Sequence, residues 1–260
     1  MIPAPPADCR RRSDWLFFLS LLPAAACVVL LLSGYGITAA IIFWSTFIVI
    51  SIGTLVPQCA WFGPLVVRLS DKEARRQGRV WLTLDDGPDP ATTPQILDLL
   101  DAHGALAGFF LIGEKARQHP ELVREIARRG HLIGNHSQTH PVASFWALRP
   151  TRIWQEVAGC QETLTQILGT APVWFRPPVG HHNLFLAPPL QALGLTLAMW
   201  DCRGYDGVEK NVPLILRRIA KDLRPGSIIL LHDATSVCTE VLVGTLRLFQ
   251  ERGLKAGLPE

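Results

Sequence analysis

The feature that most constrains this chain is a run of 53 residues, from Trp15 to Val67, that contains no Asp, Glu, Lys or Arg. Within it, residues 15–33 and 37–56 are each about as long as the ~20 residues that cross a ~30 Å hydrocarbon layer as a helix. Gly34-Tyr35-Gly36 separates the two stretches. Because so short a connection allows only an antiparallel hairpin, the chain returns to the side of the membrane from which it entered.

Positive charges flank the predicted hairpin at both ends. Arg10, Arg11 and Arg12 precede the first span, and four basic residues follow the second, namely Arg68, Lys72, Arg75 and Arg76. By the positive-inside rule, we expect an integral protein of the inner (cytoplasmic) membrane with its remaining domain on the cytoplasmic side. The alternative is a cleaved signal peptide, because arginines, an apolar stretch and Ala24-Ala25-Ala26 resemble one. The second apolar span argues against that alternative.

The rest of the chain has the composition of a soluble domain. The 25 basic and 22 acidic residues nearly cancel to a net charge of +3, so we expect no nucleic-acid partner. The six cysteines are scattered, which favours a reducing compartment. We predict a tail over 1–14, a transmembrane hairpin over 15–57, an interfacial linker over 58–78, a folded domain over 79–252 and a tail over 253–260. In the linker, Trp61, Phe62, Leu65 and Val66 are expected to hold the domain against the bilayer surface.

From Arg79 onward, short apolar runs alternate with longer amphipathic ones. The expected strands are 80–84, 108–111, 131–134, 173–175, 196–200 and 228–231. The expected helices are 94–102, 121–129, 151–168, 186–193, 212–223 and 240–251. Strands that alternate with helices predict an α/β domain with a parallel sheet. Polar clusters follow several of these strands, at the end where parallel α/β barrels assemble their sites.

The first polar cluster is Asp85-Asp86-Gly87-Pro88, which closes the first strand. Successive strand residues point to opposite sides, so one aspartate can bind a metal while the other lies above it. Asp-Asp-Gly-Pro by itself is more typical of a turn. An apolar strand that ends in paired acids nevertheless favours a nearby cation.

The second cluster contains His136 and His140. Histidines four residues apart lie on one face of a helical turn, where both imidazoles can reach one cation. Two neutral imidazoles and one carboxylate suit Zn²⁺ or another first-row divalent ion. An isolated pair at this spacing is as often found at a surface or a helix end, so the paired aspartates decide in favour of a metal site.

The third and fourth clusters are Arg176-Pro177-Pro178-Val179 and Leu230-Leu231-His232-Asp233. Two prolines fix the backbone after an arginine, which can bind an aspartate while a following N–H stays free for an oxyanion. A single histidine at a strand end is ordinarily structural. His181 and His182, which follow the prolines, are expected to be loop or surface residues.

Taken in this order, the four clusters resemble those of the polysaccharide deacetylases, the NodB-homology domains or family 4 carbohydrate esterases, over roughly Arg79 to Leu248. The resemblance implies a distorted (β/α)7-type barrel, here preceded by the transmembrane hairpin, and metal-dependent hydrolysis of an N-acetyl group from an amino sugar. It also implies roles for single residues: Asp86, His136 and His140 as metal ligands, Asp85 as general base, Arg176 as its partner and His232 as general acid.

One family motif departs from its usual pattern here. It normally has Trp, two residues, Asp, two residues and then Asp-Trp, and this chain has Trp200-Asp201-Cys202-Arg203-Gly204-Tyr205-Asp206-Gly207. Asp206 meets the second Asp and is expected to orient and charge His232. Arg203 and Gly207 replace the first Asp and the final Trp, so a pocket wall has changed. We expect Pro178, Val179 and Leu230 beside the substrate and its oxyanion.

We therefore expect a carbohydrate N-deacetylase that uses Zn²⁺, with Co²⁺, Ni²⁺ or Fe²⁺ as alternatives. A finished wall polymer lies outside the reach of a cytoplasmic site, so the expected partners are the bilayer and a lipid-linked, polyprenyl-type amino-sugar precursor. Two alternatives stay open. One is an outward-facing enzyme of the same chemistry that acts on peptidoglycan or an exopolysaccharide. The other is an inactive, membrane-tethered carbohydrate-binding protein.

Overall fold

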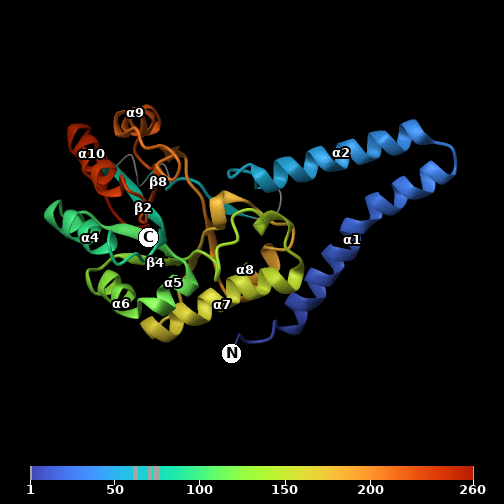
Figure 1. The fold of residues 1–260 in the computed structure, drawn as a ribbon, viewed down its shortest axis with the longest axis horizontal. Helices are drawn as coiled ribbons and strands as arrows, with labels where there is room; N and C mark the ends of the chain where they lie inside the picture. The colour runs from blue at the N-terminus through green and yellow to red at the C-terminus, as the bar shows by residue number, and fades with distance from the viewer. Residues whose placement is uncertain (1, 61–63, 70–71, 73–76, 260) are drawn as a thin grey trace.

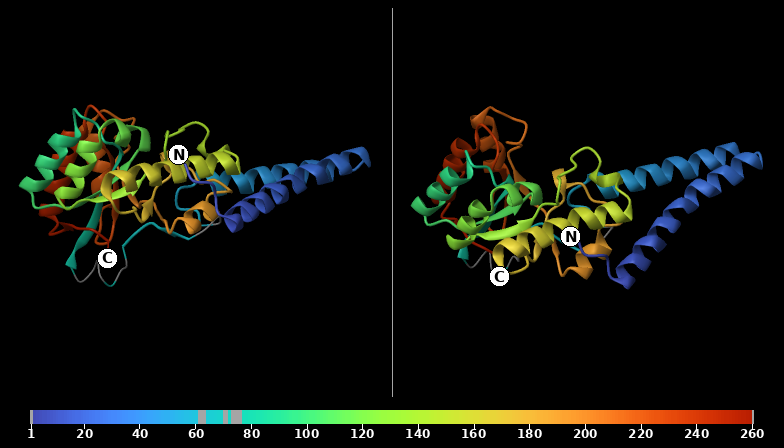
Figure 2. Two further views of the ribbon diagram at one scale, coloured as in Figure 1. Left: turned by 90° about the horizontal axis from the view of Figure 1, so that it is seen from below. Right: turned by 60° about the horizontal axis from the view of Figure 1, so that its bottom comes forward.

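The computed structural model describes residues 2–60, 64–69, 72 and 77–259 as an α/β domain with a helical hairpin projecting from one side (Figures 1 and 2). The helices are α1 Ala7–Leu32, α2 Gly36–Leu55, α4 Thr93–Ala102, α5 Gly113–Gln118, α6 Pro120–Arg128, α7 Pro150–Leu168, α8 Ala187–Ala192, α9 Val212–Asp222 and α10 Cys238–Glu251. The strands are β1 Leu65–Val66, β2 Arg79–Gly87, β3 Ala107–Leu111, β4 Leu132–Asn135, β5 Trp174–Phe175, β6 Thr196–Ala198, β7 Cys202–Arg203, β8 Ile228–His232 and β9 Lys255–Ala256. Two 3₁₀ turns are η1 Phe145–Ala147 and η2 Pro178–Gly180.

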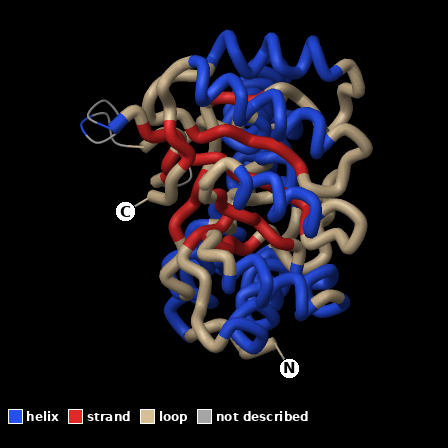
Figure 3. Tube along the Cα trace, turned by 90° about the vertical axis from the view of Figure 1, so that its left-hand side faces the viewer, coloured by secondary structure: helices blue, strands red, loops and turns tan. Residues whose placement is uncertain are grey.

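The strands form a parallel sheet in the order β1-β6-β5-β4-β3-β2-β8-β7, and β9 pairs with β2 beyond this path. Figure 3 shows the strands curled between the surrounding helices. Within the described residues, β1 and β7 stand at the two ends of the order and do not pair with each other, so the barrel stays open. The predicted distorted α/β barrel is confirmed.

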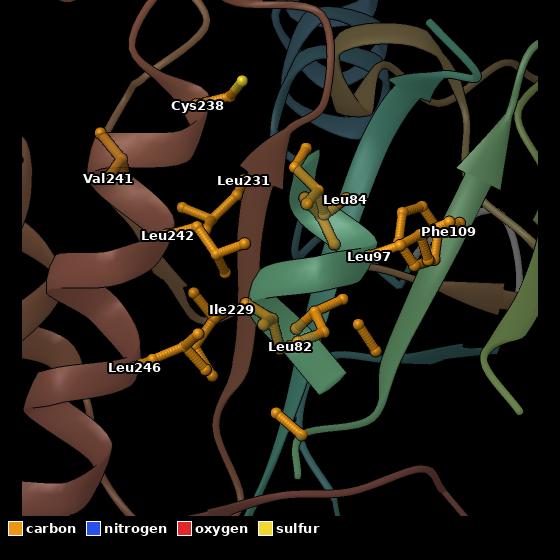
Figure 4. Packing of buried hydrophobic residues seen from close by; sticks show 14 of the residues in the cluster. Leu82, Leu84, Leu97, Phe109, Ile229, Leu231, Cys238, Val241, Leu242 and Leu246 are labelled. Atoms are coloured by element: carbon orange, nitrogen blue, oxygen red, sulfur yellow. The ribbon is translucent and has the colours of Figure 1, made fainter. Parts of the chain in front are cut away.

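Alternation along the central strand separates two parts of the core. Leu82 and Leu84 of β2 point outward and pack with residues of β8, α4 and α10 (Figure 4). Trp81 points the other way and packs inside the barrel with Phe110 and other residues. Because successive strand residues alternate, Asp85 shares the inner side with Trp81. The same strand therefore fills the core and carries an acid to the barrel interior.

The sheet extends beyond both predicted domain ends, because β1 and β9 join it. Leu65 and Val66 were expected at a bilayer surface, and they instead pair with Leu197 and Ala198 of β6. This strand was not predicted, because a short apolar run has the same pattern at an interface and in a strand. Trp61 and Phe62 lie outside the described residues.

The two N-terminal helices are each long and apolar enough to cross a membrane, with mean hydropathies of 2.5 and 2.0 over their most apolar windows. Figure 1 shows that they meet at a tip far from the domain and spread apart toward it. α1 begins at Ala7, ahead of the predicted span, so Arg10, Arg11 and Arg12 lie within the helix. The helix continues past the apolar span because its first turns pack on protein.

Both ends of the hairpin contact the α/β domain. At the α1 end, Cys9 packs against Trp154 and Ala158 of α7, and Trp154 Nε1 donates to Pro3 O at 2.7 Å. At the α2 end, His182 N–H donates to Thr54 O at 2.7 Å. His182 lies in a loop, as expected, but it is only 2% exposed because the end of α2 covers it. The hairpin is joined to the domain at two separate places.

Candidate active site

Eight of the ten predicted site residues line one pocket of about 320 Å³ at the carboxyl ends of the strands, and Arg176 and Pro178 do not. Parallel strands present their carboxyl ends at the same edge, which explains why clusters far apart in the sequence meet here. The pocket is lined by Asp85, Asp86, His136, His140, Val142, Val179, Trp200, Arg203, Tyr205, Asp206, Gly207, Val208, Leu230 and His232.

A bulge at the end of β2 brings both aspartates to the same cluster. The pairing of β2 with β3 shifts register between Asp85 and Gly87, and Asp86 takes a left-handed φ of 72°. His136 Nε2 consequently lies 3.6 Å from Asp85 Oδ2 and 3.4 Å from Asp86 Oδ1. Simple strand alternation would have separated the two carboxylates, so the expected opposite orientation is wrong in detail. Lys115 Nζ donates to Asp86 O at 2.8 Å and supports the bulge.

The two histidines meet through a loop. Ser137 and His140 have left-handed φ values of 68° and 54°, so residues 136–140 are not the helical turn that the spacing suggested. The imidazole rings nevertheless lie with their centroids 4.7 Å apart. His136 Nδ1 hydrogen-bonds Arg176 O at 2.7 Å, which turns Nε2 toward the aspartates. His140 Nε2 lies 3.1 Å from Asp86 Oδ1.

Asp86, His136 and His140 form a donor set that fits a divalent cation. Their ligand atoms lie within 4.8 Å of one another. Asp86 Oδ1 and His140 Nε2 are buried without any hydrogen-bond partner, an arrangement that costs free energy unless a cation fills the space between them. One carboxylate and two imidazoles suit a first-row divalent metal.

The titration of this cluster favours the protonation states that ligate metal. Burial of the ring, followed by the charge of His136, lowers the pKa of His140 to about 3, so the imidazole is neutral at pH 7. Burial tends to raise the pKa of Asp86, but the neighbouring His136 and His140 outweigh it and lower this pKa below its usual range. A carboxylate and a neutral imidazole are the forms that bind a cation.

Arg176 lies buried beside Asp85 and does not itself line the pocket. Its side chain is fully buried, and its Nη1 donates to Asp85 Oδ1 at 2.7 Å and to Thr83 Oγ1 at 2.8 Å. The other guanidinium nitrogens donate to Ala198 O and Met199 O, both at 3.1 Å. The structure thus places the predicted arginine on the predicted aspartate. With its donors occupied, the guanidinium fixes Asp85 and leaves Oδ2 facing the cluster.

His232 lies across the pocket on β8, where it pairs in register with Asp85 of β2. Asp206 Oδ1 lies 3.0 Å from His232 Nδ1. Burial alone would lower the pKa of His232, but the hydrogen bond and charge of Asp206 outweigh it and raise this pKa to about 9. His232 is therefore an imidazolium at neutral pH.

The three residues expected near the substrate divide into two kinds. Val179 and Leu230 line the pocket, whereas Pro178 is buried and does not line it. Val179 has a left-handed φ of 49°, an uncommon conformation for a β-branched residue, which is held by the turn η2.

Sequence reasoning missed two buried carboxylates that support the site. Glu156 of α7 is 0% exposed and accepts from Thr139 N at 2.8 Å and Thr139 Oγ1 at 2.7 Å, which fixes the histidine loop. Asp233 is also 0% exposed and accepts from Thr92 Oγ1 at 2.8 Å and Thr93 Oγ1 at 2.5 Å. For Glu156, the signal in the sequence was an acid among the apolar positions of a helix. For Asp233, it was an acid directly after an apolar strand.

Comparison with known proteins gives consistent relatives. The profile of the polysaccharide deacetylase family matches residues 72–198. A chitooligosaccharide deacetylase of Azorhizobium caulinodans is 34% identical over 160 residues, which cover 61% of this chain and 75% of the relative. A peptidoglycan N-acetylglucosamine deacetylase of Listeria monocytogenes is 29% identical over 181 residues, 70% of this chain but only 38% of the relative.

A solved structure has the same fold. The family 4 carbohydrate esterase of Streptomyces lividans, in complex with acetate, superposes with a TM-score of 0.64 at 30% identity. The match covers 69% of this chain and 92% of that one.

Proposed function

The chain belongs to the polysaccharide deacetylase family and is a carbohydrate N-deacetylase, and from this premise we propose that it deacylates a membrane-held amino-sugar glycan. The observation that carries the proposal is the arrangement of three groups in one pocket. A base, Asp85 fixed by Arg176, and an acid, His232 charged by Asp206, lie on adjacent strands beside the Asp86, His136 and His140 cluster. Metal-assisted hydrolysis of an amide uses a cation site, a base and an acid together.

In the proposed mechanism, Asp86, His136 and His140 hold a divalent metal, with Zn²⁺ preferred over Co²⁺, Ni²⁺ or Fe²⁺ on chemical grounds. When bound, such a metal polarises the amide carbonyl and makes a water molecule more acidic. Asp85 Oδ2, free of the arginine, takes the proton of the attacking water. The N–H of Val179 is proposed to stabilise the tetrahedral oxyanion, with Pro178 and Leu230 shaping its surroundings.

His232 is the proposed general acid. Its Nδ1 is bound to Asp206, so Nε2 carries the proton toward the pocket. An amine does not leave readily as an anion, so the acid must protonate the nitrogen as the C–N bond breaks. Acetate and a free amino sugar are the products.

The structure also supports a substrate held at a membrane. Seven large apolar residues are exposed in the described part of the α/β domain, and four of them, Val142, Val179, Tyr205 and Val208, line the active-site pocket. A fifth, Trp146, lines a cleft of about 390 Å³ between α1 and α2. Exposed apolar groups gathered around one pocket mark an interaction with lipid or protein.

We propose that the hairpin spans the cytoplasmic membrane and that the pocket faces the cytoplasm, because basic residues flank both helices. The substrate is then a lipid-linked amino sugar or oligosaccharide that is deacylated before export. Protease treatment of intact and lysed spheroplasts tests the orientation. Protection of residues 77–259 until lysis supports it, whereas digestion in intact spheroplasts favours the outward-facing peptidoglycan or exopolysaccharide enzyme.

Acetate release tests the activity itself. Full-length protein in detergent, supplied with Zn²⁺ and chitooligosaccharides or a lipid-linked N-acetylglucosamine, is expected to release acetate from at least the lipid-linked compound. Failure to bind stoichiometric metal, together with no acetate release from either compound, would instead support an inactive carbohydrate-binding protein.

A further inference from the structure

Arg203 is a cation in the active-site pocket to which the proposed chemistry gives no role. It ends the short strand β7 and lines the same pocket as the Asp-His-His cluster. Its guanidinium carbon lies 4.0 Å from the ring centroid of Tyr205 and 5.5 Å from that of Trp200. Two aromatic faces thus fix the position of the charge.

The donors of Arg203 are unused. Among the described residues, no carboxylate forms an ion pair with Arg203, and its guanidinium makes no hydrogen bond. Stacking engages the faces of the planar group and leaves its five N–H donors, at the edges, free for an acceptor. By contrast, the guanidinium of Arg176 in the same site donates hydrogen bonds to four acceptors. A positioned guanidinium with free edges is the usual receptor for an oxyanion.

The wall that carries Arg203 is the wall next to the membrane hairpin. Trp200 O accepts a hydrogen bond at 3.1 Å from Gln58 Nε2, three residues beyond the end of α2. Gly180 is sandwiched between Trp200 and Pro57, since a Cβ on it would lie 2.4 Å from Trp200 Cη2 and 3.2 Å from Pro57 Cγ. The chain of contacts runs from α2 through Trp200 to Arg203.

Apolar surface adjoins this cation on the pocket rim. Tyr205 is 45% exposed and Val208 is 82% exposed, and both line the pocket with Arg203. Gly207, between them, lies over His232, where an added Cβ would be 3.2 Å from Cε1. The missing side chain leaves room above the acid. Arg203 is thus a cation beside exposed apolar groups, at the side of the pocket next to the hairpin. Such a surface is complementary to an anion that is attached to a hydrocarbon chain.

We infer that Arg203 binds a phosphate group that links the amino sugar of the substrate to a lipid. The inference rests on the proposed function and narrows its substrate to a glycosyl phospholipid. Such a phosphate lies at the bilayer surface, between the sugar in the pocket and the chain in the membrane. A carboxylate on the sugar could also bind the guanidinium. It would not, however, lie between the sugar and the lipid, on the side of the pocket next to α2.

Two substrates that differ by the linking phosphate group test the inference. They are the farnesyl phosphodiester of N-acetylglucosamine and its neutral farnesyl glycoside, each given to the full-length, zinc-loaded protein in detergent. The wild type is expected to prefer the phosphodiester in kcat/KM. Arg203→Gln should raise KM for the phosphodiester by about 10- to 100-fold, as expected for a lost hydrogen bond to a charged group. Its kcat/KM for the neutral glycoside should stay unchanged.

Matched variants separate a specific effect from a general one. Arg217→Gln removes the same charge from an exposed position of α9 outside the pocket and should leave both substrates unaffected. Arg203→Asp, which places an acid at this position, should make the phosphodiester the poorer substrate by like-charge repulsion. Circular dichroism checks that each variant is folded.

Several results would overturn the inference. An equal loss on both substrates in Arg203→Gln would make the arginine structural, and no loss on either would remove it from recognition. An Arg203-dependent preference for the methyl glycoside of N-acetylmuramic acid over that of N-acetylglucosamine would assign the anion to a carboxylate. Acetate release from the neutral glycoside without any charge preference would reject the phosphate and keep the deacetylase function. No acetate from any compound would reject both.

Discussion

Asp206 binds His232 at two points, because Oδ2 accepts from the backbone N–H at 2.7 Å while Oδ1 lies 3.0 Å from Nδ1 of the ring. The backbone contact fixes the carboxylate, and the ring contact fixes the tautomer and the charge of the imidazole. The raised pKa of about 9 follows from that pairing. One residue therefore sets both the direction and the acidity of the proposed acid.

Asp206→Asn is expected to narrow the active pH range. The acid must be protonated, so activity falls as the pH rises through the pKa of His232, which is about 9 in the wild type. Without the carboxylate, burial lowers this pKa toward or below the ordinary value near ~6.5. The basic limb of the kcat profile should shift down by at least about two pH units. If the basic limb of the profile does not move, a group other than His232 must cause it.

Asp85→Asn is expected to abolish turnover while metal stays bound. The amide is nearly isosteric and can keep an oxygen on Arg176 Nη1, but it cannot take a proton from water. We expect kcat to fall by about 10²- to 10⁴-fold, the usual contribution of a general base. Metal content by atomic spectroscopy should match that of the wild type. A variant with near-normal acetate release would remove Asp85 from this role.

His140→Ala is expected to lose metal and activity together. His140 Nε2 is one of three donor atoms within 4.8 Å, so its removal leaves two ligands. Zinc bound after dialysis should drop well below one per chain. Dialysis against a chelator should inactivate the wild type, and added Zn²⁺ or Co²⁺ should restore it. His103→Ala, at an exposed position after α4, serves as the control and should retain metal.

Asp233→Asn is expected to stabilise the domain at alkaline pH. Burial raises the pKa of Asp233 to about 6, so the folded state resists ionising this carboxyl. A raised carboxyl pKa means that the destabilisation appears as the pH rises through about 6 and is absent below the unfolded value near ~3.9. The advantage of the variant should shrink by about 1.4 kcal/mol between pH 8 and pH 5. Thermal unfolding at both pH values measures it, and a pH-independent difference would contradict the argument.

The sequence predicted which residues gather at the site better than it predicted the backbone conformations that bring them together. Strand ends at one edge of a parallel sheet sufficed to bring Asp85, His136 and His232 together. The helical turn expected for the two histidines is absent, because left-handed residues at 137 and 140 aim the rings instead. Local spacing does not record backbone twists of that kind. The roles of these residues stay predictions until the variants are measured.

Features that depend on distant contacts could not be read from the chain. Arg203 departs from the family motif, but the sequence did not reveal that two rings would hold it over the pocket. Leu65 and Val66 looked interfacial because the partner strand β6 lies more than a hundred residues away. The contact between Pro3 and Trp154 was hidden for the same reason.

The two-point attachment of the hairpin has a geometric consequence under the proposed membrane insertion. A single flexible tether would let the domain swing, but contacts at α1 and at the end of α2 fix its tilt and its height above the lipid. The pocket then stays at one fixed distance from the membrane surface. If the substrate is a membrane-held glycan, as proposed above, we expect the enzyme to deacylate the sugar nearest the anchor and not the later ones.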